Sequence, residues 1–477
     1  MESTVSLHVL QRRVRQSNRT LLCHLRSIAE DAQTVRELCS ALPPWLPVYG
    51  NLRNGLWYTG ELSAEQRSRA CYFKSTDGHE RNLLFNASTR LNLDVAATAG
   101  EYGAVLIVDS TKQGKTFPDS MRVTIPLWCA VINKLVFPES PALFSPPVDM
   151  MSPLLAQHIR ETRVPGIIAG LSTDVRDLIT SSLGGGQLSA PLKPIWIFPD
   201  KDGVLEWRGE CAEAAFSAPW SQNESKRLEL DGFCAVFLLS CSGAKRARHV
   251  SEQSWEYIQG AGDDEEHWAP AGLTYQVFWA NRQRILQSDD HVEVQQEAER
   301  VVREQVMPMS PTSSPSLSLG ASNLHLHLNG KSSVVGEWDG AAVIHVGLDS
   351  TEGPIGVAHH YFRLSALRGD KSKAHAAFRD LVAFYRAQLS STYDAPKVLI
   401  ASLSEASNEA ALAIVLVLLG TFFNEQDFSL LPTPRVTARK QDIRMMVARL
   451  QTMSGCTCLL FPAKTTIKMV ALWFSMC

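Results

Sequence analysis

The residues best suited to chemistry follow an apolar run that ends at position 109. Residues 105–120 read VLIVDSTKQGKTFPDS, so a predicted strand ends in Asp109 and a loop with hydroxyl groups, lysines and a glycine follows. In open α/β sheets, ligands bind beyond the carboxyl ends of parallel strands. Backbone N–H groups and lysine side chains in such a loop can bind phosphate oxygens. The segment therefore predicts a site for a phosphate-bearing ligand.

Two known loop types can be compared with this segment. A P-loop places a glycine five residues before its Gly-Lys-Thr, and that position here is Asp109, so we reject this interpretation. In many phosphoribosyltransferases, the loop that binds phosphoribosyl diphosphate has an acidic pair before a turn rich in threonine and glycine. The segment is similar, because Asp109 matches one acidic residue, Ser110 replaces the other, and Gly114 to Thr116 occupy the turn. An ordinary strand–loop junction is the alternative.

A second polar cluster lies at residues 74–90. Lys74, Ser75, Asp77 and His79 fall within six residues around a glycine, and Arg90 follows. A histidine near an aspartate usually belongs to a turn whose hydrogen bonds are satisfied, which is the structural alternative. The four residue types together could instead serve as acid, base and anion ligands.

Carboxylates and basic residues concentrate in a third region. Residues 255–268 read WEYIQGAGDDEEHW, and Asp263 and Asp264 begin a run of four acidic side chains. Such a run faces solvent, caps a helix N-terminus or holds a divalent cation, and the last two are the interpretations we keep open. Residues 240–248 (SCSGAKRAR) follow another predicted strand and end in basic residues that could contact an anion or RNA.

The predicted elements suit a sheet that would position these loops. Apolar runs at 104–108, 194–198 and 235–239 lack strict alternation and are separated by helical stretches. This pattern is typical of parallel strands covered on both faces. Residues 12–42 predict a helix with one apolar face. Its other face is either solvated or a strip that meets phosphates, and it carries Arg12, Arg15, Arg19 and Arg26.

A stretch rich in proline and serine divides the chain. Residues 307–318 read MPMSPTSSPSLS and have no apolar period, which predicts a linker. We expect an N-terminal domain at 1–306, a linker at 307–322 and a C-terminal domain at 323–477. After the linker, apolar runs at 343–346 and 397–400 alternate with predicted helices at 373–389 and from 409. Two α/β domains are therefore the predicted fold class.

Composition excludes several classes of protein. The net charge of −3 over 477 residues excludes a uniformly basic nucleic-acid binder, although a local basic face is compatible with it. The longest apolar run, 410–423, is shorter than the roughly 20 residues of a membrane span, so it predicts a buried helix and no membrane partner. Ten scattered cysteines predict reduced, mostly buried thiols and an intracellular, cytoplasmic protein.

Several separated segments together resemble one family, the initiator-tRNA 2′-O-ribosyl phosphate transferases of fungi and plants. FKSTDGH, VDSTKQGKTFPDS with IPLWCAVIN, and YIQGAGDDEEHW carry the resemblance, and RSIAEDAQTVREL and NLRNGLWY match as well, so it covers most of residues 15–280. It implies transfer of a 5-phosphoribosyl group from phosphoribosyl diphosphate to the 2′-hydroxyl of a T-stem adenosine in initiator methionine tRNA. That modification keeps the tRNA out of elongation. Mg²⁺ is the expected cofactor, and DNA is not an expected partner.

The resemblance implies roles for the polar residues. Asp109 is the first choice for the base or for stabilising a cationic sugar, with Asp77 and His79 as rivals, and Asp263 and Asp264 form the candidate metal pair. Asp119 and Ser120 are assigned to ribose hydroxyls. Further donor contacts are assigned to Lys74, Ser75, Arg90, Ser110, Thr111, Lys112, Gly114, Lys115 and Thr116. The RNA phosphates are assigned to Arg12, Arg13, Arg15, Arg19, Lys245, Arg246 and Arg248.

The second half of that family resembles a dual-specificity phosphatase. Such an enzyme needs a nucleophilic cysteine and an arginine in the loop after a strand. After residues 398–400 this chain has Ala401, Ser402, Leu403 and Ser404, with neither residue type through Ala411. We therefore expect a non-catalytic unit with a phosphatase-like fold. The competing function for the whole chain is a protein that binds RNA or a phosphorylated ligand and catalyses nothing.

Overall fold

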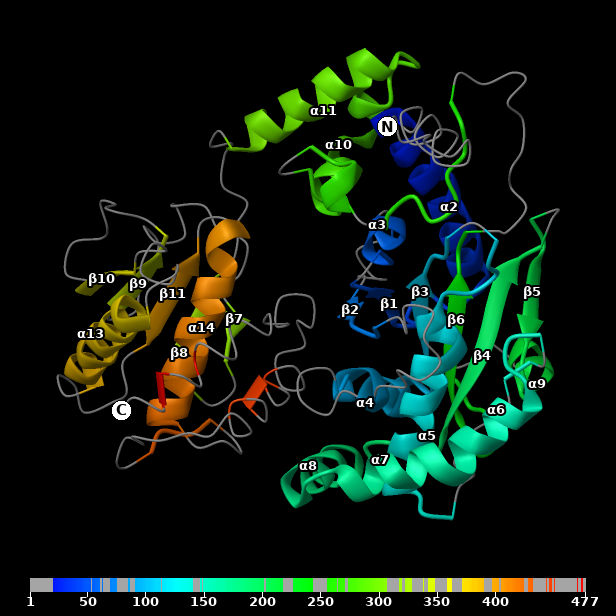
Figure 1. The fold of residues 1–477 in the computed structure, drawn as a ribbon, viewed down its shortest axis with the longest axis horizontal. Helices are drawn as coiled ribbons and strands as arrows, with labels where there is room; N and C mark the ends of the chain where they lie inside the picture. Colours follow the sequence, from blue (N-terminus) through cyan, green and yellow to red (C-terminus); the bar gives the residue numbers. More distant parts are fainter. Residues whose placement is uncertain are drawn as a thin grey trace, which may run out of the picture. The chain divides into compact units, whose positions relative to one another are not determined.

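Two separate sheets organise the chain in a computed structural model, one in each of two units (Figure 1). The first unit comprises residues 1–85 and 95–307, and the second comprises 86–94 and 308–477. The structure describes residues 20–52, 54–60, 62, 69–74, 85, 91–112, 114–139, 146–147, 149–200, 203–217, 226–242, 255–263, 265–270, 273–306, 317–319, 322–327, 338, 342–347, 358–362, 371–389, 397–402, 405–423, 428–431, 443, 446–447, 450, 470 and 473–474.

The first sheet has six strands in the order β2-β1-β3-β6-β4-β5. All neighbouring strands are parallel except the pair β4–β5. The bounds are β1 Val48–Asn51, β2 Arg69–Cys71, β3 Ala104–Asp109, β4 Leu192–Pro199, β5 Leu205–Arg208 and β6 Cys234–Ser240. Strands β3 and β6 are buried along their whole length, because helices cover both faces. The predicted parallel strands are confirmed.

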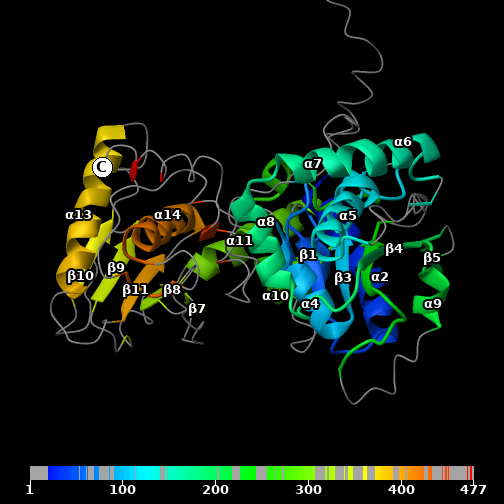
Figure 2. The ribbon, with the colours of Figure 1, turned by 90° about the horizontal axis from the view of Figure 1, so that it is seen from below.

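Two helical layers enclose this sheet. Figure 2 shows it between α5–α7 on one side and α2 on the other. On the α5 side, Tyr49 of β1 donates a hydrogen bond to Thr98 of α4 at 3.0 Å, and Trp196 of β4 donates to the carbonyl of Met121 at 2.9 Å. The bounds on that side are α4 Leu93–Tyr102, α5 Ile125–Val136, α6 Pro153–His158, α7 Val164–Gly170 and α8 Thr173–Leu183. On the other side they are α2 Leu21–Ala41, α3 Leu56–Thr59, α9 Ala212–Phe216, α10 Tyr275–Ile285 and α11 His291–Val306.

Helix α2 differs from the predicted amphipathic helix with a basic face. Fourteen of its residues are buried, among them the polar side chains of His24, Ser27 and Asp31. Arg26, expected on the basic face, is paired with Asp289 just before α11. The reason is tertiary, since residues 257–261, Trp268 and the segment just before α11 pack against the polar side chains of α2. The other arginines predicted on that face lie outside the described residues.

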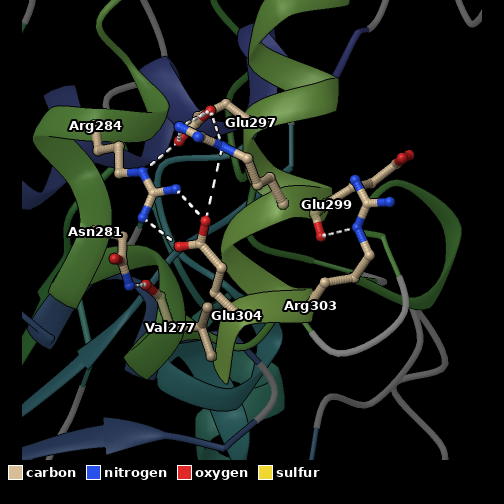
Figure 3. Close-up of polar contacts among 8 residues, drawn as sticks. Val277, Asn281, Arg284, Glu297, Glu299, Arg303 and Glu304 are labelled. Carbon is tan, nitrogen blue, oxygen red and sulfur yellow. Dashed lines mark hydrogen bonds and ion pairs between the residues drawn. The ribbon is translucent and has the colours of Figure 1, made fainter. Parts of the chain in front are cut away.

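Ion pairs join α10 to α11 on the outside of this layer (Figure 3). Arg284 donates two hydrogen bonds to Glu304, at 2.6 and 2.9 Å, and is also paired with Glu297. Arg300 binds Glu297 at 2.8 Å. These groups are partly exposed, so each pair stabilises the contact between α10 and α11 only modestly.

The second unit has its own five-stranded sheet, in the order β10-β9-β11-β8-β7. All pairs are parallel except β7–β8. The bounds are β7 Leu317–Ser318, β8 Leu324–His327, β9 Ala342–Val346, β10 Ala358–Phe362, β11 Val398–Ser402, α13 Lys371–Leu389 and α14 Glu405–Phe422. The buried helix predicted at 410–423 is confirmed within α14. Both units are therefore α/β, as predicted, while the likeness of the second to a phosphatase stays a prediction.

Two other sequence expectations can be compared with the described residues. No helix among them is long and apolar enough to cross a bilayer. None of the seven described cysteines forms a disulfide; six are buried, and Cys211 is partly exposed. The assignment of roles to 1–306 and 323–477 stays a prediction, and most of the linker at 307–322 lies outside the described residues.

A buried histidine pair predicts how the second unit responds to acid. His345 of β9 is fully buried, stacks on Tyr361, and lies with its Nε2 2.9 Å from Nδ1 of His359. Burial and the neighbouring His359 lower the pKa of His345 to about 4, from the ordinary value of 6.5. Stability that depends on the neutral form is thus fully present above pH 6.5 and is lost as the pH falls toward 4.

We expect about 3 kcal/mol of stability in this unit to be lost over that interval. Hydrogen exchange of β9 amides in the full chain, corrected for intrinsic rates, measures it. His345→Phe keeps an aromatic ring against Tyr361 and removes the titrating group, so it should flatten the dependence. An equally steep dependence in that variant would assign the effect to other groups.

Candidate active site

The carboxyl ends of β1 and β3 bring together a buried carboxylate and its hydrogen-bond donors. Oδ2 of Asp109 accepts hydrogen bonds from Nδ2 of Asn51 at 2.7 Å and from the hydroxyl of Ser120 at 2.8 Å. Oδ1 accepts one from the N–H of Ser110 at 2.9 Å. Asp109 is only 2% exposed. Donors on both oxygens favour the ionised carboxylate and fix its plane.

The loop after Asp109 is fastened to the end of the neighbouring strand β6. The N–H of Thr111 donates to the hydroxyl of Ser242 at 2.9 Å, and the hydroxyl of Ser240 donates to the carbonyl of Thr116 at 2.6 Å. Phe117 is buried against Phe198 of β4, with ring centroids 5.2 Å apart. The loop is therefore held at both ends, and Gly114, at φ 90°, forms its open turn.

Two lysines of this loop carry positive charge to the surface. Nζ of Lys112 lies 2.8 Å from Oδ2 of Asp263, and Nζ of Lys115 lies 2.9 Å from Oδ1 of Asp119. Arg122 approaches the same oxygen of Asp119 at 3.7 Å. The lysine side chains are 62% and 46% exposed, whereas both carboxylates are 7% exposed. Each ammonium can therefore also reach an anion in solvent, because an exposed ion pair holds its partners weakly.

The glycine-containing segment 257–263 is anchored by the polar side of α2. The N–H of Ile258 donates to the hydroxyl of Ser27 at 2.8 Å, and the hydroxyl of Tyr257 donates to Asp31 at 2.7 Å. Nδ1 of His24 lies 2.8 Å from the carbonyl of Ala261. Burial and the nearby Asp31 raise the pKa of Tyr257 far above its ordinary range, so its hydroxyl remains a donor.

This anchored segment lies directly against the loop of Asp109. A side chain on Gly260, which has φ 71°, would come within 2.7 Å of the carbonyl oxygen of Thr111. Gln259 donates to the carbonyl of Lys115 at 2.9 Å, and the N–H of Gly262 donates to the hydroxyl of Tyr58 at 2.9 Å. Two segments about 150 residues apart in the chain thus form one surface at the sheet edge.

The end of β2 brings Lys74, the described member of the second predicted cluster, to the same edge. Asn51 binds Phe73 through both its amide atoms, and Lys74 follows directly. The carbonyl of Lys74 accepts a hydrogen bond from the hydroxyl of Thr124 at 2.9 Å. Lys74 is therefore next to the segment that follows Ser120, on the same edge as Asp109.

The structure brings some of the predicted site residues together, and others lie outside the described part of the chain. It brings together Asp109, Lys112, Lys115, Asp119, Ser120 and Asp263, with Lys74 at the start of the neighbouring loop. Ser110 and Thr111 are buried, and their N–H groups are bonded within the protein. Their contacts with a substrate, and those of Gly114 and Thr116, stay predictions. The remaining predicted residues lie outside the described part: Arg12, Arg13, Arg15, Arg19, Ser75, Asp77, His79, Arg90, Lys245, Arg246, Arg248 and Asp264.

Asp263, the described residue of the predicted capping pair, does not cap an amphipathic helix. Residues Glu265–His267 form a single 3-10 turn, and α10 begins later, with Thr274 as its cap. The carboxylate of Asp263 binds Lys112 instead. Within the described part of the chain, no three His, Cys, Asp or Glu side chains lie close enough to hold a metal ion. A cation fits here only in the way Mg²⁺ is often bound, by a carboxylate together with substrate phosphates.

Sequence reasoning missed several polar residues of the site. Asn51 and Asn54 end or follow β1, while Ser242 and Gln259 follow β6. For Asn51, Asn54 and Ser242 the signal is position, because β1 and β6 both flank β3 and polar residues at their carboxyl ends lie near Asp109. That signal depends on strand order, which the sequence does not display.

Comparison with known proteins gives a family and two relatives. The family described as the Rit1 N-terminal domain matches residues 14–303. The chain is 30% identical over 291 residues to tRNA A64-2′-O-ribosylphosphate transferase of Saccharomyces cerevisiae, covering 58% of this chain and 53% of that protein. It is 32% identical over 274 residues to uncharacterized protein C3F10.06c of Schizosaccharomyces pombe, covering 55% and 52%. The chain thus spans about half the length of these relatives. No solved structure matches it.

The contact at Gly260 can be tested with a matched glycine. A Cβ on Gly232, which has φ 74°, would meet no atom within 4 Å, whereas one on Gly260, at φ 71°, would meet the Thr111 carbonyl at 2.7 Å. Gly232→Ala should cost about 1 kcal/mol of stability, the strain of a left-handed residue. Gly260→Ala should cost about 2 to 3 kcal/mol, because the loop of Asp109 must also move. Thermal unfolding measures both, and equal losses would contradict the close contact.

Proposed function

The chain belongs to the family of the Rit1 N-terminal domain, and we propose that it is an enzyme that transfers a ribosylphosphate group to tRNA. The relative from Saccharomyces cerevisiae carries that activity in its name. More finely, we propose phosphoribosyl diphosphate as the donor and the 2′-hydroxyl of a T-stem adenosine of initiator methionine tRNA as the acceptor. The observation that carries the proposal is the pair of exposed lysines, Lys112 and Lys115, on a loop built around buried carboxylates.

The donor's negative charge suits this edge of the sheet. Lys74, Lys112, Lys115 and Arg122 contribute four cations around it, and three of them are already paired with carboxylate oxygens. A diphosphate would replace Asp263 and Asp119 as the partner of the lysines. The exchange is favourable because phosphate oxygens accept charge-assisted hydrogen bonds from several donors at once. These residues would therefore hold the leaving group.

Transfer requires the bond between C1 of the ribose and the diphosphate to break as the 2′-oxygen attacks. The sugar becomes cationic in that transition state, so a fixed negative charge nearby lowers the barrier. We assign this electrostatic role to Asp109, because its donors keep it ionised and it is too well hydrogen-bonded to be a strong base. Removal of the proton from the attacking hydroxyl is then left to Asp77 or His79.

Mg²⁺ belongs to the proposal as a ligand of the bound donor. Asp263 would supply a carboxylate once Lys112 turns to the diphosphate, and donor oxygens would supply further ligands. When bound, the cation would neutralise charge on the leaving diphosphate.

The protein would recognise the acceptor tRNA as an A-form helical stem. Its deep major groove is closed to side chains, so the protein must use the backbone shape and the 2′-hydroxyls. The basic residues predicted before α2 and after β6 would supply phosphate contacts. We propose the cytoplasm as the location, because free buried thiols suit a reducing compartment.

The first test incubates the purified protein with Mg²⁺, labelled phosphoribosyl diphosphate and unmodified initiator tRNA. We expect label on that tRNA and none on elongator methionine tRNA, because the acceptor must be recognised before transfer. Binding of the tRNA without transfer would instead favour the non-catalytic RNA-binding protein. Elongator tRNA labelled equally well would contradict the proposed specificity and leave the transferase standing.

Asp109→Asn removes the negative charge at the centre of the site and keeps a side chain of nearly the same size and shape. Transfer should fall by at least about 100-fold, since a preorganised charge at the sugar is lost. The affinity for tRNA should stay nearly unchanged, as measured by filter binding. A parallel loss of affinity and of cooperative unfolding would show a folding defect rather than a lost electrostatic role.

Lys112→Ala tests the proposed diphosphate contact. The KM for the donor should rise about tenfold, the size expected for one charge-assisted hydrogen bond, while the KM for tRNA stays unchanged. Lys134→Ala is the control, because Lys134 lies in the last turn of α5 and binds the carbonyl of Pro138. Equal effects of the two substitutions on steady-state kinetics would contradict a specific role for Lys112.

A further inference from the structure

We infer that Asn51 is the positioning residue that sets the geometry of the active site, an inference that rests on the proposed function. Its side chain is 1% exposed and joins three strand ends. Nδ2 donates to Oδ2 of Asp109 at 2.7 Å and to the carbonyl of Phe73 at 3.0 Å, and Oδ1 accepts from the N–H of Phe73 at 2.9 Å. One amide therefore links the carboxylate after β3 to the segment that carries Lys74.

The amide group suits this position better than any other. Oδ1 must accept from a backbone N–H, while Nδ2 must donate to a carbonyl and to a carboxylate, so the position needs an acceptor and two donors on one planar group. A carboxylate there would lack both donors. It would also place a second negative charge within hydrogen-bonding distance of Asp109.

The surrounding backbone holds Asn51 in place. Asn51 is the last residue of β1, which lies between β2 and β3. Gly55 folds back so closely that a Cβ there would lie 2.1 Å from the carbonyl oxygen of Val108 and 2.4 Å from the nitrogen of Asn51. Asn51 touches none of the proposed substrate-binding lysines in the described structure, so it acts through Asp109 and through the position of residues 73–74.

The chain contains a matched control for this residue. Asn133 of α5 is fully buried and binds the backbone of Leu192 in the same two-sided way, with Nδ2 donating at 2.9 Å and Oδ1 accepting at 2.7 Å. Within the described part of the chain, its hydrogen-bond partners include no carboxylate. Asn→Asp at position 133 therefore removes the same kind of backbone bridge without placing a charge beside Asp109.

The experiment measures kcat and KM for transfer as a function of pH in the full chain. In Asn51→Asp, the new carboxyl group and Asp109 should share one proton at low pH, because two such close carboxylates cannot both ionise. Transfer should then persist in acid. As the pH rises, both carboxyl groups ionise and their repulsion separates the segments after β1 and β3, so transfer should fall at least about 100-fold. KM for tRNA should change less than about threefold, since neither Asn51 nor residues 73–74, which it holds, are assigned to the tRNA. Asn133→Asp should lack this loss of transfer with rising pH.

A second measurement is independent of transfer. In the doubly substituted Asn51→Asp/Asp109→Asn chain, an amide and a carboxylate still face one another with exchanged positions. If the effects of the two single substitutions simply added, they would predict a certain ratio of folded to unfolded protein. In the double variant this ratio should be at least about tenfold higher than that prediction. Asn51→Ala gives the baseline without either group.

These measurements can overturn the positioning role of Asn51 or the proposed function separately. Loss of kcat by the same factor at every pH in Asn51→Asp, or the same pH response in Asn133→Asp, overturns the positioning role. If the unsubstituted protein transfers nothing, the proposed function fails. In that case, recovery of stability in the double variant still supports Asn51 as the group that holds Asp109. If the double variant recovers no stability, this positioning role is overturned as well.

Discussion

The structure of the first unit depends on a buried carboxylate at the edge of a parallel sheet, whose oxygens must all accept hydrogen bonds. Asp109 ends the central strand β3, where helices cover both faces and solvent barely reaches. An ionised group in that position is costly unless donors surround it. Asn51, Ser120 and the N–H of Ser110 supply them from two strand ends and one helix start. The requirement therefore fixes how those segments meet.

The same requirement explains the role of α2. The segment 257–263 has little regular structure of its own, yet it must lie against the loop of Asp109. Helix α2 provides that support through Ser27, Asp31 and His24, which bind successive parts of the segment. A helix that reads as half-solvated in the sequence is thus an internal scaffold. Its polar side chains bind groups of the protein itself and leave few charges to meet RNA within the described residues.

The sequence predicted the strands and the loop because their signals are local. The apolar runs at 104–108, 194–198 and 235–239 became β3, β4 and β6 with at most two residues added at either end. The loop with Asp109, Lys112 and Lys115 was found from residue types alone. Asn51, Ser242 and Gln259 were missed, since an asparagine, a serine and a glutamine have no meaning until the fold places them against Asp109 or the loop that follows it. The helix-capping interpretation was wrong for Asp263 for a similar reason, because its partner, Lys112, is distant in sequence.

What the sequence determined by itself was therefore the class of fold, the family, and a loop rich in cations and carboxylates. These follow from periodicity, composition and short motifs, which neighbouring residues carry without reference to the rest of the chain. Tertiary structure alone decided which polar groups face one another: Asn51 with Asp109, Lys112 with Asp263, and α2 with residues 257–261. Hydrogen bonds act over about 3 Å. Only the folded order β2-β1-β3-β6 brings groups that are far apart in the sequence within that reach.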